Sequence, residues 1–215
     1  MLVIFDCDGA LVDSEPIVNH VESRFLSSYG WNLTPADVRA LFKGRPFSEI
    51  VRLIEARIPA QLPDGWVYDL AMETALAFHR DLSAIPGVLE LLERLHEQHV
   101  PLCVASQSSL SRVNLSLRVC KLDSFFGARV FSASMVPRPK PAPDIFLHAA
   151  NELGYTPDDC VVIEDSPAGV HAAVAAGMRV FGYSENEDAQ LLRQAGATTF
   201  PHMSELIRLL GVQEA

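Results

Sequence analysis

The sequence predicts an α/β protein, with one parallel sheet and an all-helical insert, on two observations. From about residue 84 onward, short apolar runs of strand length alternate with helical patterns. Between the first such run, at 2–5, and that alternating region lies a block, 15–83, with helical segments and no convincing strand. Strands that alternate with helices favour a parallel, Rossmann-like sheet with right-handed crossovers. The expected fold is a discontinuous α/β core, 1–14 and 84–215, interrupted by a helical domain at 15–83.

The first predicted strand is Leu2–Phe5, a continuous apolar run typical of a strand that is buried on both faces. Further strands are expected at 101–105, 129–131, 160–163, 179–183 and, at an edge, 198–200. A helix is expected after Pro86-Gly87, and others at 109–120, 143–153, 167–177 and 203–210.

Within the insert, capping residues indicate where helices start. Ser14, with Pro16 in the first turn, predicts a helix that runs to about Tyr29 and ends at Gly30. Further helices are expected to open at Thr34-Pro35, at Ser48 and at Asp64, the last of them reaching past Phe78. The whole block is therefore predicted to be helical.

Composition and charge limit the class of protein. No apolar run approaches the ~18 residues of a membrane span, and Asp6 and Asp8 interrupt any signal-peptide core. The net charge of −10 argues against nucleic acids and anionic membranes as partners, but it does not exclude a small phosphorylated metabolite. A cytoplasmic protein that is a monomer or a weak dimer is expected. The cysteines are spaced as small core residues, not as a zinc or redox motif: Cys7, Cys103, Cys120 and Cys160.

Asp6 and Asp8 follow the first predicted strand and are the first candidates for chemistry. On extended backbone, side chains two residues apart share a face. Two neighbouring carboxylates repel, which raises one pKa unless a cation settles between them. Gly9 then allows tight backbone beside a ligand. The stretch predicts a corner for a divalent metal and a phosphate, with a purely structural Asp-x-Asp-Gly turn as the alternative.

Three further strand ends carry polar residues. Ser106-Gln107-Ser108 precedes a helix whose exposed N–H groups can bind an anion, or it serves only as a helix cap. Lys140 lies between prolines that restrict the backbone. It is either a cation held in place for a ligand or an ordinary solvated lysine. Glu164 and Asp165 precede a helix that is expected to start at Ser166. They either belong to a functional site or only favour the helix N-terminus, where acidic side chains are stabilising. In parallel sheets ligands bind beyond the carboxyl ends of the strands, so these residues are expected together.

These stretches resemble the motifs of the haloacid dehalogenase-like hydrolase superfamily. The segment from Phe5 to Glu15 resembles its opening motif, in the branch that holds β-phosphoglucomutase and small sugar phosphatases. Lys140-Pro141-Ala142-Pro143-Asp144 and the segment from Glu164 to Gly169 are especially specific to that branch. The C-terminal half is also similar to the bacterial 6-phosphogluconate phosphatases, at 146–150 and 198–202.

The resemblance implies a role for each motif residue. Asp6 would attack phosphorus and form an aspartyl-phosphate, and Asp8 would act as general acid and then general base. Ser106 and Lys140 would hold the phosphoryl oxygens, next to the substrate-binding positions Gly9 and Gln107. The implied cofactor is Mg²⁺, bound by the carboxylates of Asp6 and Asp165, the backbone carbonyl of Asp8 and, through water, Glu164.

In this family the helical insert corresponds to a cap over the site. Lys43-Gly44-Arg45 resembles the substrate loop of the cap, so Arg45 would bind a carboxylate or a second phosphate, unless it is an ordinary solvated charge. The sequence departs from β-phosphoglucomutase at two cap positions. Val18 stands where the mutase has a histidine, and Phe47 where it has an arginine.

The function expected from these features is a Mg²⁺-dependent phosphatase that hydrolyses a small sugar or sugar-acid phosphate through an aspartyl-phosphate. The alternatives are a phosphohexomutase like β-phosphoglucomutase and a non-catalytic protein that binds a sugar phosphate. Val18 and Phe47 count against the mutase, because neither side chain can grip a phosphate or hydrogen-bond a general base. The complete set of motif residues counts against a non-catalytic protein.

Overall fold

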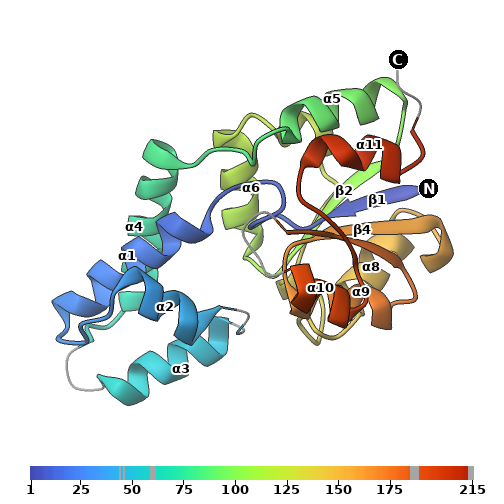
Figure 1. The fold of residues 1–215 in the computed structure, drawn as a ribbon. Coiled ribbons are helices and arrows are strands. Elements are labelled where there is room, and N and C mark those ends of the chain that lie inside the picture. The colour runs from blue at the N-terminus through green and yellow to red at the C-terminus, as the bar shows by residue number, and fades with distance from the viewer. Residues whose placement is uncertain (44, 46, 59–61, 185–188, 213–215) are drawn as a thin grey trace. The chain divides into compact units, whose positions relative to one another are not determined.

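The computed structural model describes residues 1–43, 45, 47–58, 62–184 and 189–212. The chain divides into two compact units, each considered separately below. The first combines Met1–Val12 with Ser83–Ala215, and the second is Asp13–Leu82 (Figure 1).

A six-stranded sheet forms the centre of the first unit, with the order β3-β2-β1-β4-β5-β6 and every pairing parallel. β1 therefore lies between β2 and β4. Phe5, the last residue of β1, lies opposite Val104 of β2 and Ile163 of β4, so the carboxyl ends of these three strands reach the same edge. The strands are β1 Leu2–Phe5, β2 Leu102–Ser106, β3 Val130–Ser132, β4 Cys160–Glu164, β5 Arg179–Tyr183 and β6 Thr198–Phe200.

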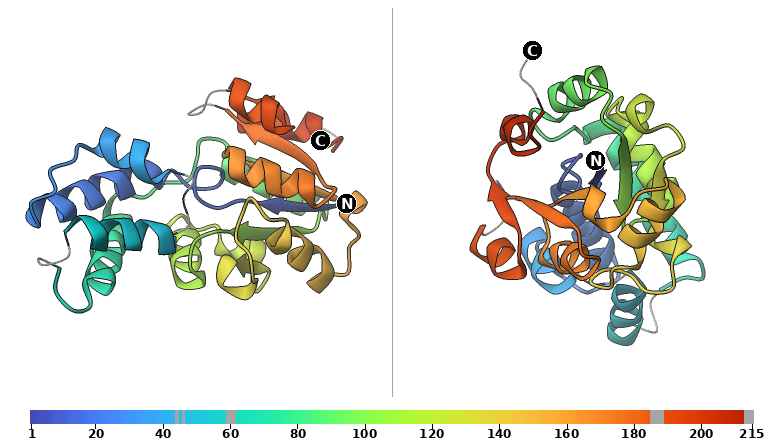
Figure 2. Two further views of the ribbon diagram at one scale, coloured as in Figure 1. Left: turned by 90° about the horizontal axis from the view of Figure 1, so that it is seen from below. Right: turned by 90° about the vertical axis from the view of Figure 1, so that its right-hand side faces the viewer.

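Helices cover both faces of this sheet. In Figure 1, α5 and α11 lie above the sheet and α8, α9 and α10 below it, and Figure 2 shows the same layers from two further sides. The helices of this unit are α5 Val88–Glu97, α6 Leu110–Val119, α7 Asp123–Phe126, α8 Asp144–Glu152, α9 Pro167–Ala175, α10 Ala189–Ala195 and α11 Leu206–Leu209. Short 3₁₀ helices lie at Ala133–Met135, Pro157–Asp159 and Met203–Glu205.

Alternation along β1 divides its side chains between the two layers. Leu2 and Ile4 belong to a buried cluster with Phe146 of α8. Phe5 instead contacts the ring of Phe126 in α7 edge-on, with 6.2 Å between the ring centroids. All of β1 is fully buried, which explains why its sequence is apolar without interruption. The core therefore fixes the strand that carries Asp6 and Asp8.

The second unit contains the helices α1 Glu15–Ser28, α2 Pro35–Phe42, α3 Phe47–Arg57 and α4 Trp66–Asp81. Its buried cluster includes Phe25 of α1 and Trp66 of α4, whose rings lie 6.1 Å apart. Thr34 and Asp37 form a capping box at the start of α2, each accepting a hydrogen bond from the backbone of the other.

The predicted fold class is confirmed, and each predicted strand agrees with an observed strand to within one residue at either end. The short helices α7 and α10 and the 3₁₀ helices at Ala133–Met135 and Pro157–Asp159 were not predicted, and the helix expected at 203–210 is a 3₁₀ turn, Met203–Glu205, followed by α11. Ser14 occupies the N-cap position of α1, as expected, but its side chain makes no capping hydrogen bond. No helix in the described part of the chain is long and apolar enough to cross a membrane. The role of the helical unit as a cap stays a prediction.

Candidate active site

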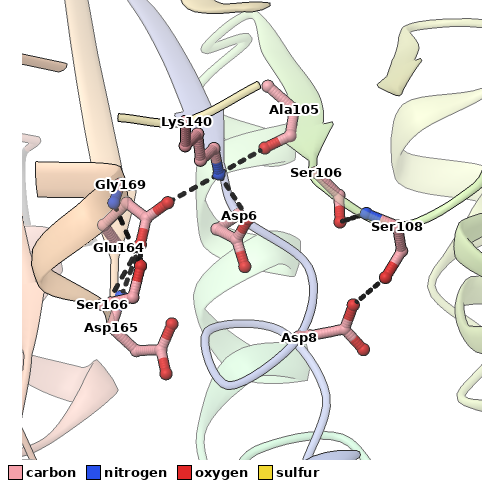
Figure 3. A network of polar contacts seen from close by, with 10 residues as sticks. All are labelled: Asp6, Asp8, Ala105, Ser106, Ser108, Lys140, Glu164, Asp165, Ser166 and Gly169. Carbon is pink, nitrogen blue, oxygen red and sulfur yellow. Dashed lines mark hydrogen bonds and ion pairs between the residues drawn. The ribbon is translucent and has the colours of Figure 1, made fainter. Parts of the chain in front are cut away.

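The ammonium group of Lys140 forms the centre of the site at the carboxyl edge of the sheet (Figure 3). Its Nζ donates to Asp6 Oδ1 at 2.6 Å, to Glu164 Oε1 at 2.6 Å and to the carbonyl oxygen of Ala105 at 3.0 Å. These acceptors come from β4, from the end of β2 and from the residue after β1. One side chain therefore joins the ends of three neighbouring strands.

The three charged groups of this centre are almost completely buried. Lys140 is 2% exposed, Asp6 6% and Glu164 0%. Burial raises the pKa of Asp6 to about 8; Lys140 opposes this shift, while Glu164 and Asp8 add to it. Burial alone would lower the pKa of Lys140, because it disfavours the charged form. The combined attraction of Asp6 and Glu164 is larger, so the pKa of the ammonium is raised. Two carboxylates share one ammonium, so Lys140 alone does not offset the cost of ionising Asp6 in this buried site.

Glu164 connects Lys140 to the start of α9. Its Oε2 accepts hydrogen bonds from the backbone N–H groups of Asp165 and Ser166, both at 3.1 Å, and from Ser166 Oγ at 2.9 Å. Ser166 Oγ in turn accepts from the N–H of Gly169 at 3.1 Å and caps the helix. A Cβ at Gly169 would lie 1.8 Å from Glu164 Oε1, so only glycine fits beside this carboxylate.

Asp165 packs against Gly9. A Cβ at Gly9 would lie 2.2 Å from Asp165 Oδ2, and the φ of Gly9 is +90°, a conformation that favours glycine. Asp165 is itself 7% exposed. The turn after β1 and the turn after β4 therefore meet closely, with the carboxylate of Asp165 between them.

Asp8 lies in a more open environment than Asp6, with 21% of its side chain exposed. Ser108 Oγ donates to Asp8 Oδ2 at 2.6 Å (Figure 3), and Arg112 Nη2 donates to Asp8 Oδ1 at 3.2 Å. Ser106 is buried, and its Oγ accepts from the N–H of Ser108 at 3.1 Å. The turn after β2 thus contacts the turn after β1 through hydrogen bonds.

Comparison with known proteins decides the family. The model of the haloacid dehalogenase-like hydrolases matches residues 3–183. The chain belongs to this family. The resemblance predicted from the motifs is therefore confirmed.

Named relatives agree with this membership. Over 210 residues the chain is 31% identical to 6-phosphogluconate phosphatase of Escherichia coli, covering 96% of this chain and 93% of the relative. It is 32% identical over 211 residues to a phosphorylated carbohydrates phosphatase of Thermotoga maritima, covering 97% of each. The prediction that this chain is an enzyme, a phosphoric monoester hydrolase of the haloacid dehalogenase-like family, is confirmed.

Solved structures are similar over nearly the whole chain. A haloacid dehalogenase-like protein of unknown function from Agrobacterium tumefaciens has a TM-score of 0.80 and 37% identity, covering 98% of this chain and 97% of the other. A putative β-phosphoglucomutase from Thermotoga maritima has a TM-score of 0.81 and 29% identity, covering 98% of both. The proteins that this chain resembles therefore include named phosphatases and one structure titled a putative mutase.

The structure brings most of the predicted site residues together. Asp6, Lys140 and Glu164 are in direct contact, and Asp165 lies against Gly9. The predicted Asp8 and Ser106 both contact Ser108, while Gln107 is half-buried in the same turn.

Arg45 belongs to the second unit, where it donates to the carbonyl oxygen of Leu41 at 2.7 Å and forms an ion pair with Glu49. The predicted substrate loop falls partly outside the described residues, because Gly44 is not among them. Substrate binding by Arg45 stays a prediction.

Sequence reasoning did not select Ser108 or Arg112 as partners of Asp8. A signal for Arg112 was present, because it lies in the first turn of α6, three residues after the N-cap Ser109. The helix dipole opposes a cation at that end of a helix. An arginine there indicates that a nearby carboxylate compensates.

We predict that Gly169→Ala destabilises the protein, because the added methyl group would overlap the buried carboxylate of Glu164. The expected loss is about 1–3 kcal/mol in the free energy of unfolding, as is typical of an overpacked site. Chemical denaturation measures it, with Ala175→Ser, at an exposed position of α9, as the control. If the overlap is the cause, adding Glu164→Ala to Gly169→Ala will cost less than Glu164→Ala alone. Additive losses would contradict this explanation.

Proposed function

We propose that the chain is a Mg²⁺-dependent phosphatase that hydrolyses a small sugar or sugar-acid phosphate through a phosphorylated Asp6. The position of Asp6 is the main support: it is buried at the carboxyl end of β1, with Lys140 Nζ bound to its Oδ1. That contact orients the carboxylate and keeps positive charge beside it, so we assign the attack on phosphorus to Oδ2. The names of the relatives, which include phosphatases of sugar acids and carbohydrates, support the substrate class.

The two aspartates share the reaction. In the first step Asp6 forms a bond to phosphorus, the bond between phosphorus and the ester oxygen breaks, and Asp8 gives its proton to that oxygen. In the second step the ionised Asp8 takes a proton from water, whose oxygen bonds to phosphorus while Asp6 is released. The hydroxyl of Ser106 can donate to a phosphoryl oxygen, while Lys140, whose three N–H donors contact Asp6, Glu164 and Ala105, stabilises the phosphoryl group through its charge. Losing one such donor typically costs roughly 3–4 kcal/mol in the barrier.

The residues present fit a magnesium ion. Mg²⁺ prefers oxygen ligands and usually keeps several waters. Asp6 and Asp165 are buried carboxylates, and the absence of a side chain at Gly9 leaves room for Asp165 at the turn after β1. A cation at this position would also stabilise the ionised form of Asp6, whose pKa burial raises. We assign the carboxylates of Asp6 and Asp165 and the backbone carbonyl of Asp8 as ligands.

A ready cluster of three or more acidic, histidine or cysteine ligands is not formed by the described side chains. A magnesium site built from two carboxylates, one carbonyl and waters does not require one. Glu164 has hydrogen bonds at both oxygens, so its proposed contact with the ion passes through water. When bound, Mg²⁺ would neutralise charge on the phosphoryl group as it is transferred.

Cap residues support a phosphatase over a mutase. A mutase must delay hydrolysis and hand the phosphoryl group to a second sugar hydroxyl. Val18 and the half-exposed Phe47 cannot supply the histidine and arginine that the mutase has at these positions. Arg45 would instead contact an acidic group of the substrate, in exchange for Glu49. A small phosphorylated metabolite remains the proposed partner, and a cytoplasmic monomer or weak dimer the proposed state.

Asp6→Asn should abolish turnover without unfolding the protein, because the amide cannot attack phosphorus and is nearly the same size. Single-turnover assays with 6-phosphogluconate and Mg²⁺ test this, with the exposed Asp158→Asn as the matched control. Chemistry in Asp6→Asn above about a thousandth of the wild-type rate, which corresponds to about 4 kcal/mol, would exclude Asp6 as the nucleophile.

Magnesium is expected to stabilise the folded protein, because the ion relieves repulsion among the clustered carboxylates. At about 100 times its Kd, a ligand adds about 2.7 kcal/mol to the free energy of unfolding. Thermal unfolding across a magnesium titration measures the effect, and Asp165→Ala should blunt it while the exposed Asp158→Ala does not. An unchanged response in Asp165→Ala would remove this residue from the ligand set.

Product analysis separates the phosphatase from the mutase. Without the cap residues of the mutase, water should accept the phosphoryl group from Asp6 faster than a sugar does. We expect one phosphate to be released for each substrate consumed, measured on 6-phosphogluconate, β-glucose 1-phosphate and related hexose phosphates. Conversion of β-glucose 1-phosphate to glucose 6-phosphate with little free phosphate would replace the phosphatase with the mutase.

A further inference from the structure

Both carboxylate oxygens of Asp8 are held by side chains of the segment that follows β2. Ser108 Oγ donates to Oδ2 at 2.6 Å, and Arg112 Nη2 donates to Oδ1 at 3.2 Å. All three residues belong to the same compact unit, although Asp8 is separated from Ser108 by 100 positions in the sequence. The proposed catalytic mechanism does not yet use either partner.

Ser108 is itself fixed from two sides. Its backbone N–H donates to Ser106 Oγ at 3.1 Å, and its carbonyl oxygen accepts from Ser132 Oγ at 2.7 Å. Ser106 and Ser132 are both buried and end the neighbouring strands β2 and β3. The hydroxyl that contacts Asp8 is therefore tied to the carboxyl edge of the sheet.

Arg112 reaches Asp8 from the first turn of α6, where its backbone N–H donates to Ser109 Oγ at 3.4 Å. About a third of its side chain is exposed, and Asp8 provides the negative charge that compensates the unfavourable helix dipole. Such a charge-assisted hydrogen bond is stronger than a neutral one.

We propose that Ser108 and Arg112 are positioning residues that orient Asp8 for proton transfer and place its proton on Oδ2. This inference rests on the proposed function, in which Asp8 protonates the ester oxygen and then accepts a proton from water. Arg112 is positively charged and disfavours a proton on Oδ1, the oxygen that it contacts, whereas the Ser108 hydroxyl at Oδ2 is neutral and can donate or accept. The proton therefore resides on Oδ2, the oxygen next to Ser108.

Ser108 suits both protonation states of Asp8. A protonated Oδ2 donates its hydrogen to the ester oxygen and still has a lone pair to accept from the Ser108 hydroxyl. After that transfer, the ionised Oδ2 keeps the same hydrogen bond while it accepts a proton from water. The pair of contacts thus holds one orientation through both steps.

Substrates that differ in their need for a proton test this role. With 6-phosphogluconate, whose alkoxide is a poor leaving group, Arg112→Ala and Ser108→Ala should lower kcat by about tenfold or more with little change in KM. Arg112→Lys should restore part of the rate. The first burst of p-nitrophenolate from p-nitrophenyl phosphate should keep its rate, because this leaving group departs without a proton. Arg118→Ala and Ser111→Ala, at exposed positions of α6, are the matched controls.

Equal losses on both substrates, or no loss on either, would overturn the proposal. A second test uses the Asp8→Asn background, in which Arg112→Ala should cause no additional loss of turnover. A further loss there would mean that Arg112 acts on the substrate directly and not through Asp8.

Crystal structures of Arg112→Ala and Ser108→Ala provide a readout that does not depend on activity. We expect the carboxylate of Asp8 to turn or to occupy several rotamers in each variant, while Asp6 and Lys140 keep their contact. An unchanged Asp8 in both variants would overturn the proposal. If the wild-type protein released no phosphate from any substrate, the proposed function would fail, and these structures would still decide whether Ser108 and Arg112 position Asp8.

Discussion

The contact of one buried ammonium with two carboxylates is the constraint on which the site depends. A cation removed from water is costly unless it is paired and hydrogen-bonded, and Lys140 satisfies this with Asp6, Glu164 and a backbone carbonyl. Removing one partner of a buried pair typically costs about 3–5 kcal/mol, because a charge is left uncompensated. The strand ends that supply these partners must therefore remain in register. The same contact that holds the edge of the sheet together also orients the proposed nucleophile.

This constraint extends to the glycines around the site. Glu164 can reach Lys140 and also accept hydrogen bonds from the turn before α9 only because Gly169 has no side chain. Gly9 has the corresponding relation to Asp165. The two carboxylates at the end of β4, Glu164 and Asp165, thus each pack against a glycine. The pairing explains why glycine stands at these two positions.

The sequence predicted the strands and the residues at their ends, because apolar runs and parallel topology are local or general features. It did not predict which side chains contact one another. Arg112 and Asp8 are 104 positions apart, and although an arginine in the first turn of a helix points to a nearby carboxylate, the sequence does not say which one. Glu164 was expected to contact the ion through water, and the sequence did not show that its direct partners are Lys140 and Ser166. Short helices such as α7 were missed because four residues are too few to show a helical period.

Asp6 and Asp8 leave the same strand only two residues apart, yet their surroundings differ. Asp6 is buried against an ammonium that keeps positive charge next to it, as a nucleophile requires. Asp8 is more exposed and is held by a hydroxyl and a guanidinium, so it can exchange protons with an alcohol or with water. Asp6 follows β1 directly and Asp8 lies in the turn beyond it, and in the proposed reaction both act on one phosphorus atom. The different neighbours, supplied by separate loops, then give two chemically identical carboxylates different tasks.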